Sequence, residues 1–299
     1  MKTIKNITVL ISAIILFACN SDDKEYDASG TFEATEVIVS SEANGKILSL
    51  NIQEGSKIKA NDIAGVIDST QLYLKKLQIL ASVNAVQSRK PDIEKQIAVI
   101  EQQIGTAEYE KKRIENLIKS NAVPGKQLDD INAQISVLEK QLIALKSNLD
   151  VSTRGINQES NAIEVQVAQL DDQLKKCVIT SPIDGTVLVK YAEAGELAVM
   201  GKPLFKIADT DNMLLRAYIV SSQLSDIQLG QKVKVSADYG ENKIKEYKGE
   251  IVWISNKAEF TPKTILTKDE RANLVYATKI AVKNDGYLKI GMYGKIKIK

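Results

Sequence analysis

The sequence predicts an elongated, multidomain α+β protein in which a long antiparallel α-helical coiled-coil hairpin is inserted into a split β-sandwich. Two observations predict this fold class. Residues 39–68 align without a gap on residues 179–208, at a constant offset of 140 positions. The stretch between these two copies carries an apolar heptad pattern that is interrupted once, near its middle.

The composition excludes several classes of function. The chain has 299 residues, of which 44% are apolar, so it can fold into two or three domains. Its net charge of +2 gives no strongly basic surface, and we therefore expect no nucleic-acid partner. The sequence contains no histidine, which excludes a Ser-His-Asp triad and a histidine-based zinc site. We accordingly expect no catalytic site, no metal and no cofactor.

Residues 1–18 have the features of a signal peptide. Lys2 and Lys5 precede an apolar run at residues 7–17. This run has about eleven residues, whereas a membrane-spanning helix needs roughly 20. We therefore expect a cleaved export signal in place of a transmembrane helix.

The apolar run ends in a segment, Leu16-Phe17-Ala18-Cys19, that resembles a bacterial lipobox. This resemblance implies that Cys19 is the acylated first residue of the mature protein. One acyl chain binds a bilayer only marginally, whereas the several chains of a lipoprotein anchor it stably. The polar residues 20–27 would be a spacer between the lipid and the fold. The alternative is an ordinary signal sequence in which Cys19 has no role.

The two repeat copies carry the same turn chemistry. Gly45 follows Asn and Gly185 follows Asp, in tight turns where a positive φ favours glycine, and Gly55 and Gly195 come ten residues later. Each copy is too small to bury a face alone. We therefore expect the two to close into one flattened sandwich. Its halves are placed at 37–70 and 176–209.

Residues 71–175 between the halves form the predicted hairpin. Its apolar seam alternates by three and four residues, with a turn at Pro124-Gly125 and a tip near 119–126. Arms of about 48 residues would each be on the order of 70 Å long. The seam positions are Ile79, Val83, Val86, Ile93, Ile97, Ile100, Ile104, Ala107, Ile114 and Ile118, then Leu128, Ile131, Ile135, Leu138, Leu142, Leu145, Leu149, Ile156, Ile163 and Leu170.

Pro91 interrupts the first arm. Equal distances from the turn place it level with Thr153 to Gly155 in the second arm, where the helix formers are also weak. The sequence therefore predicts a kink or break that both arms share at this level.

The order of these parts, together with phrases in the C-terminal third, resembles the HlyD-type membrane fusion proteins. The phrases are Leu214–Val220, Leu229–Val235, Ala258-Glu259-Phe260-Thr261-Pro262-Lys263 and Gly291-Met292. The resemblance implies a lipoyl-like domain that is split by the hairpin and followed by a β-barrel at 210–284. It also implies a membrane-proximal β-domain, formed by a first strand within 19–36 and a last strand at 285–299. The Phe260-Thr261-Pro262 segment is similar to the ABC-associated branch of the family.

The resemblance also assigns a role to the hairpin tip. Adaptors that dock on TolC-like channels carry an Arg, a Leu four residues later and a Ser seven residues after that. Arg113 and Leu117 match this pattern, while Pro124 stands where the family has Ser. Without the family, Arg113 is a solvated charge and Leu117 an apolar residue beside the seam.

The resemblance implies a periplasmic adaptor that is anchored to the inner membrane as a lipoprotein. It would link an inner-membrane transporter, of ABC type, to a TolC-like outer-membrane channel for efflux or secretion. Six copies would form a ring. Two alternatives remain: a lipid-anchored coiled-coil scaffold or surface adhesin, and a biotin or lipoyl carrier protein. The carrier needs a lysine on a turn that the hairpin replaces here.

Overall fold

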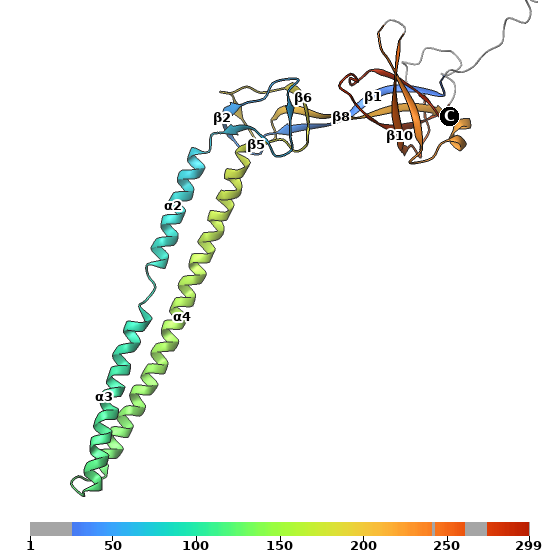
Figure 1. The fold of residues 1–299 in the computed structure, drawn as a ribbon. Coiled ribbons are helices and arrows are strands. Elements are labelled where there is room, and N and C mark those ends of the chain that lie inside the picture. The colour runs from blue at the N-terminus through green and yellow to red at the C-terminus, as the bar shows by residue number, and fades with distance from the viewer. Residues whose placement is uncertain (1–25, 241–242, 261–273, 299) are drawn as a thin grey trace, which may run out of the picture.

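The protein is elongated, with a barrel and a sandwich lying in line and a helical hairpin leaving the sandwich at an angle (Figure 1). The computed structural model describes residues 26–240, 243–260 and 274–298. The β-barrel and the helical region of the predicted mixed class are confirmed. The elements are β1 Ala28–Ser40, β2 Gly45–Leu50, β3 Lys57–Ile58, β4 Ile63–Ile67, α2 Thr70–Gln87, α3 Ile93–Lys119, α4 Lys126–Lys176, β5 Val178–Thr180, β6 Gly185–Lys190, β7 Leu197–Ala198, β8 Pro203–Val220, the 3₁₀ helix η1 Ser221–Asp226, β9 Lys232–Asp238, β10 Ile244–Ile254, β11 Glu259–Phe260, β12 Leu274–Lys283 and β13 Tyr293–Lys297.

The two sequence copies bind each other reciprocally in the sandwich. The backbone N–H of Ile47 donates to the carbonyl of Glu196 at 2.8 Å, and that of Val187 donates to the carbonyl of Ser56 at 2.9 Å. Each residue of the second bond lies 140 positions from its counterpart in the first. The strands follow the same rule, because β2 pairs with β7 as β6 pairs with β3. The sandwich is therefore a pseudo-twofold unit.

The repeated glycines have two different roles. Gly55 and Gly195 have φ of 85° and 96°, the left-handed region in which glycine is favoured. The expected left-handed backbone is absent at Gly185, so that part of the prediction is wrong. A Cβ on Gly185 would instead lie 2.4 Å from the carbonyl oxygen of Ala208, and one on Gly45 would lie 2.9 Å from the equivalent carbonyl. Glycine is needed at these two positions because a neighbouring strand passes so close.

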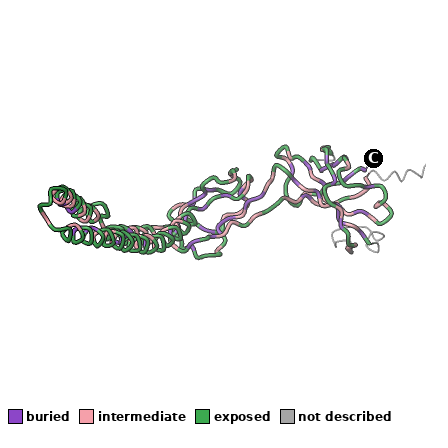
Figure 2. Tube along the Cα trace, turned by 90° about the horizontal axis from the view of Figure 1, so that it is seen from below, coloured by how far each residue is buried: buried purple, intermediate pink, exposed green. Residues whose placement is uncertain are grey.

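The β structure has two separate hydrophobic cores, joined by the long strands β1 and β8 (Figure 2). Side chains such as Phe205 and Ile207 fill the sandwich core, and Phe32 and Leu215 lie in the barrel core. In the barrel, β12 pairs with β10 and with β8, which closes the sheet on itself. Only two strands therefore run from one core to the other in the described part of the chain.

The terminal strand differs from the expectation of a separate membrane-proximal domain. β13 pairs with β1 and β9 inside the nine-stranded sheet, and Ile296 and Ile298 are buried in the barrel core. A lone strand of five residues cannot bury a face by itself, so it joins the barrel. In the described residues, the two ends of the chain thus complete the barrel.

The hairpin consists of α2 and α3 packed against the single long helix α4. The predicted seam faces inward, except that Ile93, at the start of α3, is 37% exposed. The first arm breaks between Gln87 and Ile93, and Asp92 caps α3 by accepting a hydrogen bond from the N–H of Lys95. α4 runs unbroken for 51 residues. The expected break is therefore present in the first arm, and its predicted counterpart in the second arm is wrong.

The turn between the arms is made by a different residue from the expected one. Asn121 has φ of 53° and provides the left-handed conformation, whereas Gly125 has φ of −57° and caps the start of α4. Asparagine is the residue that most often replaces glycine in this conformation. Pro124 therefore marks the end of the turn, just before the second arm begins.

The close approach at Gly185 makes a testable prediction. Gly185→Ala should lower the free energy of unfolding by about 2–4 kcal/mol, because the added methyl group meets a strand backbone that cannot move freely. Gly125→Ala is the matched control, since its methyl group meets nothing within 4 Å, and it should change stability by less than about 0.5 kcal/mol. Chemical denaturation followed by circular dichroism measures both. Equal stabilities of the two variants would contradict the close approach.

Candidate functional site

The hairpin tip is a compact cap on the coiled coil. Its core consists of Ala107, Ile114, Ile131 and Ile135, with Val123 of the turn packed against them. The hydroxyl of Ser120 and the N–H of Ala122 both donate to the carbonyl of Leu117, each at 2.9 Å. Because these bonds satisfy the Leu117 carbonyl near the end of α3, the outermost turn has a defined shape.

The three residues assigned to the tip lie within its last turns. Arg113 and Leu117 are four residues apart on α3 and so lie on one face of the helix. The Arg113 side chain is 67% exposed, and its guanidinium lies 3.5 Å from the Glu110 carboxylate. Leu117 is half-buried and Pro124 is exposed in the turn. The tip thus presents a loosely paired cation, an apolar side chain and a rigid turn to solvent.

Two assignments made from the sequence fall outside the described residues. Cys19 lies in the segment 1–25, and Thr261-Pro262 lies in the segment 261–273. Within the described residues, none of the helices has the length and apolar character needed to span a membrane.

The described part of the chain offers little material for catalysis. It contains no cluster of three metal-ligating side chains. Cys177 is 1% exposed, and burial raises the pKa of its thiol. An open cleft of about 1020 Å³ lies where the sandwich meets α2 and α4, and its walls mix apolar side chains with the paired charges Asp172 and Lys176.

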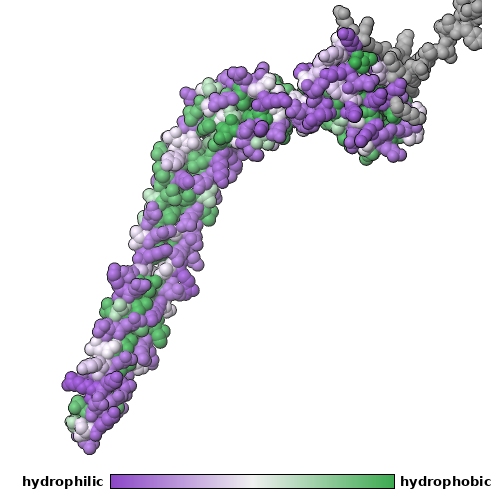
Figure 3. Space-filling model, viewed as in Figure 1, coloured by the Kyte–Doolittle hydropathy of each residue, from purple (hydrophilic) through white to green (hydrophobic). Residues whose placement is uncertain are grey.

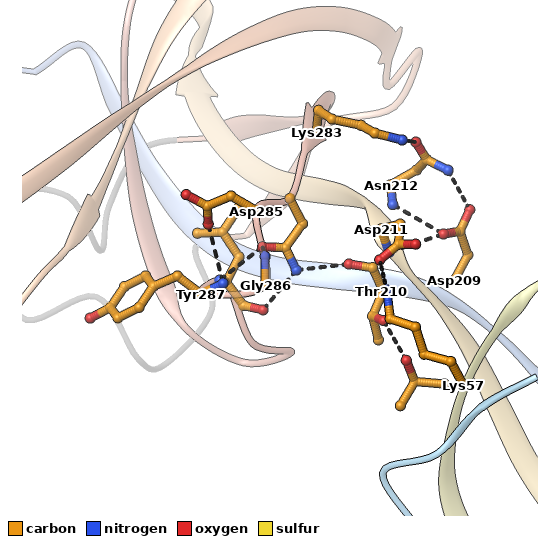
Figure 4. A network of polar contacts seen from close by, with 12 residues as sticks. Lys57, Asp209, Thr210, Asp211, Asn212, Lys283, Asp285, Gly286 and Tyr287 are labelled. Atoms are coloured by element: carbon orange, nitrogen blue, oxygen red, sulfur yellow. Dashed lines mark hydrogen bonds and ion pairs between the residues drawn. The ribbon is translucent and has the colours of Figure 1, made fainter.

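Sequence reasoning missed the polar junction between sandwich and barrel (Figure 4). Strand β8 has a bulge here. Glu33 faces Leu214 and Thr35 faces Asp209, so a step of two residues in β1 corresponds to a step of five in β8. The carboxylate of Asp209 accepts hydrogen bonds from the N–H groups of Asp211 and Asn212 and so closes the bulge on itself. The run of turn-forming residues at 209–212 was the available signal.

The bulge forms polar contacts with both the sandwich and the barrel. On the sandwich side, Lys57 pairs with Asp211 at 2.8 Å and the hydroxyl of Thr186 lies 2.7 Å from that of Thr210. On the barrel side, the amide of Asn284 donates to the carbonyl of Thr210 at 2.7 Å. These polar contacts supplement the two strands that connect the cores, and they define the geometry of the junction.

The next residue, Asp285, ties the junction loop to the barrel wall. Lys245 lies 2.5 Å from Asp285 and between 5.2 and 5.7 Å from the rings of Tyr239, Tyr247 and Tyr287. The hydrogen bond from Lys245 lowers the pKa of Asp285, and the one from Lys57 lowers the pKa of Asp211. Because the folded-state pKa of each carboxyl is lowered, both ion pairs contribute at neutral pH and are lost as the pH falls through those values.

Comparisons with known proteins agree with this fold. The family model described as RND MFP, barrel-sandwich hybrid domain, matches residues 35–210. A UPF0194 membrane protein of Citrobacter koseri is 27% identical over 284 residues, which cover 88% of this chain and 85% of the relative. A UPF0194 membrane protein of Acidithiobacillus ferridurans is 25% identical over 294 residues, covering 91% and 86%.

Two solved structures have the same fold. MacA from Actinobacillus actinomycetemcomitans has a TM-score of 0.56 at 23% identity, covering 90% of this chain and 76% of that one. A MacA–MexA chimera, which contains the α-hairpin domain of Pseudomonas aeruginosa MexA, has a TM-score of 0.54 at 22% identity and covers 91% and 81%.

The fold and the inserted hairpin define a barrel-sandwich hybrid protein. Because the family model spans more than half of the chain, the protein belongs to the membrane fusion protein family. Members of this family generally work with an inner-membrane transporter and an outer-membrane channel, form oligomers and have no enzymatic activity.

The junction makes the second prediction. The Asn284 side chain forms four hydrogen bonds within the chain, so Asn284→Ala should cost about 2–3 kcal/mol by leaving partly buried backbone groups unpaired. Lys57→Ala should cost less than about 1 kcal/mol, because that ion pair is 70% and 57% exposed. The fluorescence of Trp253, the single tryptophan, reports unfolding of the barrel. A larger effect of Lys57→Ala would contradict this assignment.

Proposed function

We propose that the protein is a periplasmic adaptor that links an inner-membrane transporter to a TolC-like outer-membrane channel for efflux or secretion. The observation that carries this proposal is the hairpin itself. A helix of 51 residues with a rise of 1.5 Å per residue is about 75 Å long, and both ends of the hairpin are held at one sandwich. Such a rod bridges a distance, with its base near one membrane and its tip at another component.

The tip is the proposed docking site on the outer-membrane channel. Arg113 and Leu117 match the pattern of TolC-docking adaptors, and both lie within the last two turns of α3. A cation beside an apolar side chain suits protein contacts, because arginine combines charge with a broad apolar stem. Pro124 would contribute shape in place of the hydroxyl that the family has there.

The base of the protein is proposed to lie at the inner membrane. Acylated Cys19 would hold the N-terminus to the bilayer, and β1, which follows the spacer, enters the barrel directly. The barrel would then face the transporter. We propose an ABC transporter because of the resemblance at residues 258–263, although the matching family model is described as RND.

A ring of copies, six by resemblance to the family, would enclose the export path. The helix α2 supports association because it exposes large apolar side chains: Tyr73, Leu74 and Leu77 are 53%, 51% and 44% exposed. Apolar surface gathers on the part of the hairpin near the sandwich, while the tip is mostly hydrophilic (Figure 3).

The tip supplies the third prediction. A photo-crosslinker placed at Leu117 in cells should capture an outer-membrane channel, and Arg113→Glu should reduce that capture about tenfold, as expected when a charged contact at an interface is reversed. Lys140→Glu is the control, since Lys140 is also an exposed cation of the hairpin but lies away from the tip residues Arg113 and Leu117. Equal loss in both variants, or capture of no channel, would contradict docking at the tip.

The same cells identify the transporter. A crosslinker on the barrel should capture a membrane subunit that co-purifies with an ATPase if the partner is an ABC transporter. Capture of a transporter without an ATPase would overturn that choice. Protease added to intact cells separates the adaptor from a surface adhesin, because only the adhesin would be cleaved.

Lipidation supplies the fourth prediction. Labelled palmitate should enter the wild-type protein, and Cys19→Ala should abolish the label and move the protein from the membrane fraction to the soluble fraction. Cys177→Ala is the control, because that thiol is buried in the sandwich. Incorporation that does not depend on Cys19 would exclude the anchor.

A further inference from the structure

The break in the first arm does not disturb the pairing of the arms. Lys76 pairs with Asp171 on one side of the break, and Glu101 pairs with Lys146 on the other. Both arms therefore have 25 residues between these two ion pairs, although only α4 is helical throughout. The first arm thus reaches across its break without shifting its register against α4.

The two arms are poorly packed at the level of the break. In the first arm no side chain from residue 87 to residue 106 is buried. In α4, Ser160 is the only buried residue between Leu149 and Leu170, and it brings a hydroxyl into the seam. The hydroxyl of Thr153 is also buried and has no hydrogen-bond partner. The apolar seam is therefore less deeply buried here than at the tip.

A two-helix rod with one broken arm bends more easily in the plane of the two helices than an unbroken rod does. Bending in the plane of both helices requires one arm to lengthen and the other to shorten, and helices resist this because their hydrogen bonds fix the rise per residue. Residues 88–92 are not helical, so they can change length at little cost. α4 needs only to curve, which long helices do readily. The break at residues 88–92 therefore removes the resistance to bending at that level of the hairpin, in the plane that contains both arms.

We propose that residues 88–92, together with the facing part of α4 around Gly155, form a hinge on which the outer hairpin swings in the plane of the two arms. In the observed state Gln87 and Arg89 hold this hinge against α4: Gln87 donates hydrogen bonds to Ser160 at 3.1 Å and to Glu164 at 3.4 Å, and Arg89 pairs with Glu159 at 2.5 Å. α3 is about 40 Å long for its 27 residues, so a swing of about 20° would move the tip by roughly 14 Å. The hinge is a property of the chain alone and does not depend on the proposed partners.

Pro91 prevents α2 and α3 from joining into one continuous helix. It has no N–H to donate to the carbonyl of Gln87, which instead accepts a hydrogen bond from the N–H of Lys90. Val86 and Ile93, the seam positions on either side, are seven residues apart, so the heptad continues across the break. Replacing Pro91 can therefore fuse α2 and α3 into one helix without rotating either.

Pulsed electron paramagnetic resonance on the full chain in detergent tests the hinge, with spin labels on non-thiol reactive amino acids because the chain has its own cysteines. One pair of labels replaces Gln78 and Gln103 on the broken arm. The reference pair replaces Ala144 and Gln169, which lie opposite on α4 with the same separation of 25 residues. All four positions are exposed. We expect the distance distribution of the first pair to be about twice as broad as that of the reference pair.

Pro91→Ala should narrow the first distribution to the width of the reference, and Arg89→Ala with Gln87→Ala should broaden it. The matched control for the Gln87 and Arg89 contacts is Lys146→Ala, which removes an interhelical ion pair away from the break and should leave the width unchanged. Equal widths of the two pairs in the wild type would overturn the hinge, as would an unchanged distribution in Pro91→Ala.

Discussion

The reciprocal pairing of residues 39–68 with residues 179–208 is the constraint on which the rest of the structure depends. It brings together two segments that are far apart in the sequence, and β4 and β5, which flank the hairpin, lie side by side because of it. The N–H of Ile67 donates to the carbonyl of Cys177 at 2.8 Å, directly at the base of the rod. The buried hydroxyls of Ser41 and Ser181 repeat the same local bond in each copy. Without this pairing the start of α2 and the end of α4 would not be held side by side, and the orientation of the hairpin relative to the sandwich would not be defined.

The modules of the protein are joined in ways that differ in strength. Within the sandwich and the barrel, closed apolar cores hold the strands. Among the described residues, these modules share only the strands β1 and β8, and the bulge at residues 209–212 is held by polar bonds. Solvent competes for such bonds, so each contributes less than a buried apolar contact of similar size. The chain thus concentrates its stability inside the modules and leaves the junctions comparatively weak.

The sequence predicted the features that depend on a regular period. The heptad seam was correct at nearly every position, because the inward face of a coiled coil follows directly from spacing. The kink was right in the first arm, where Pro91 cannot continue a helix, and wrong in α4, where Gly155 costs only about 1 kcal/mol in a helix that is already long. The need for glycine at position 185 was correct, but its cause was not, because the approach of Ala208 belongs to the tertiary structure. The bulge of β8 was missed although the turn-forming residues at 209–212 indicated it, because a turn sequence does not by itself show that a strand continues on both sides.

The residues that determine the shape of the hairpin tip are different from those that determine its position. The tip has its own cluster around Ile114 and Ile131, and the Ser120 and Ala122 bonds to Leu117 complete its turn. The sandwich fixes the base independently. Because residues 87–106 and the facing stretch of α4 between Leu149 and Leu170 belong to neither cluster, the proposed hinge would change where the tip lies without altering the surface that the tip presents. For the proposed adaptor, which would meet an outer-membrane channel across a variable distance, this separation is useful because the residues that shape the contact surface differ from those that set its position.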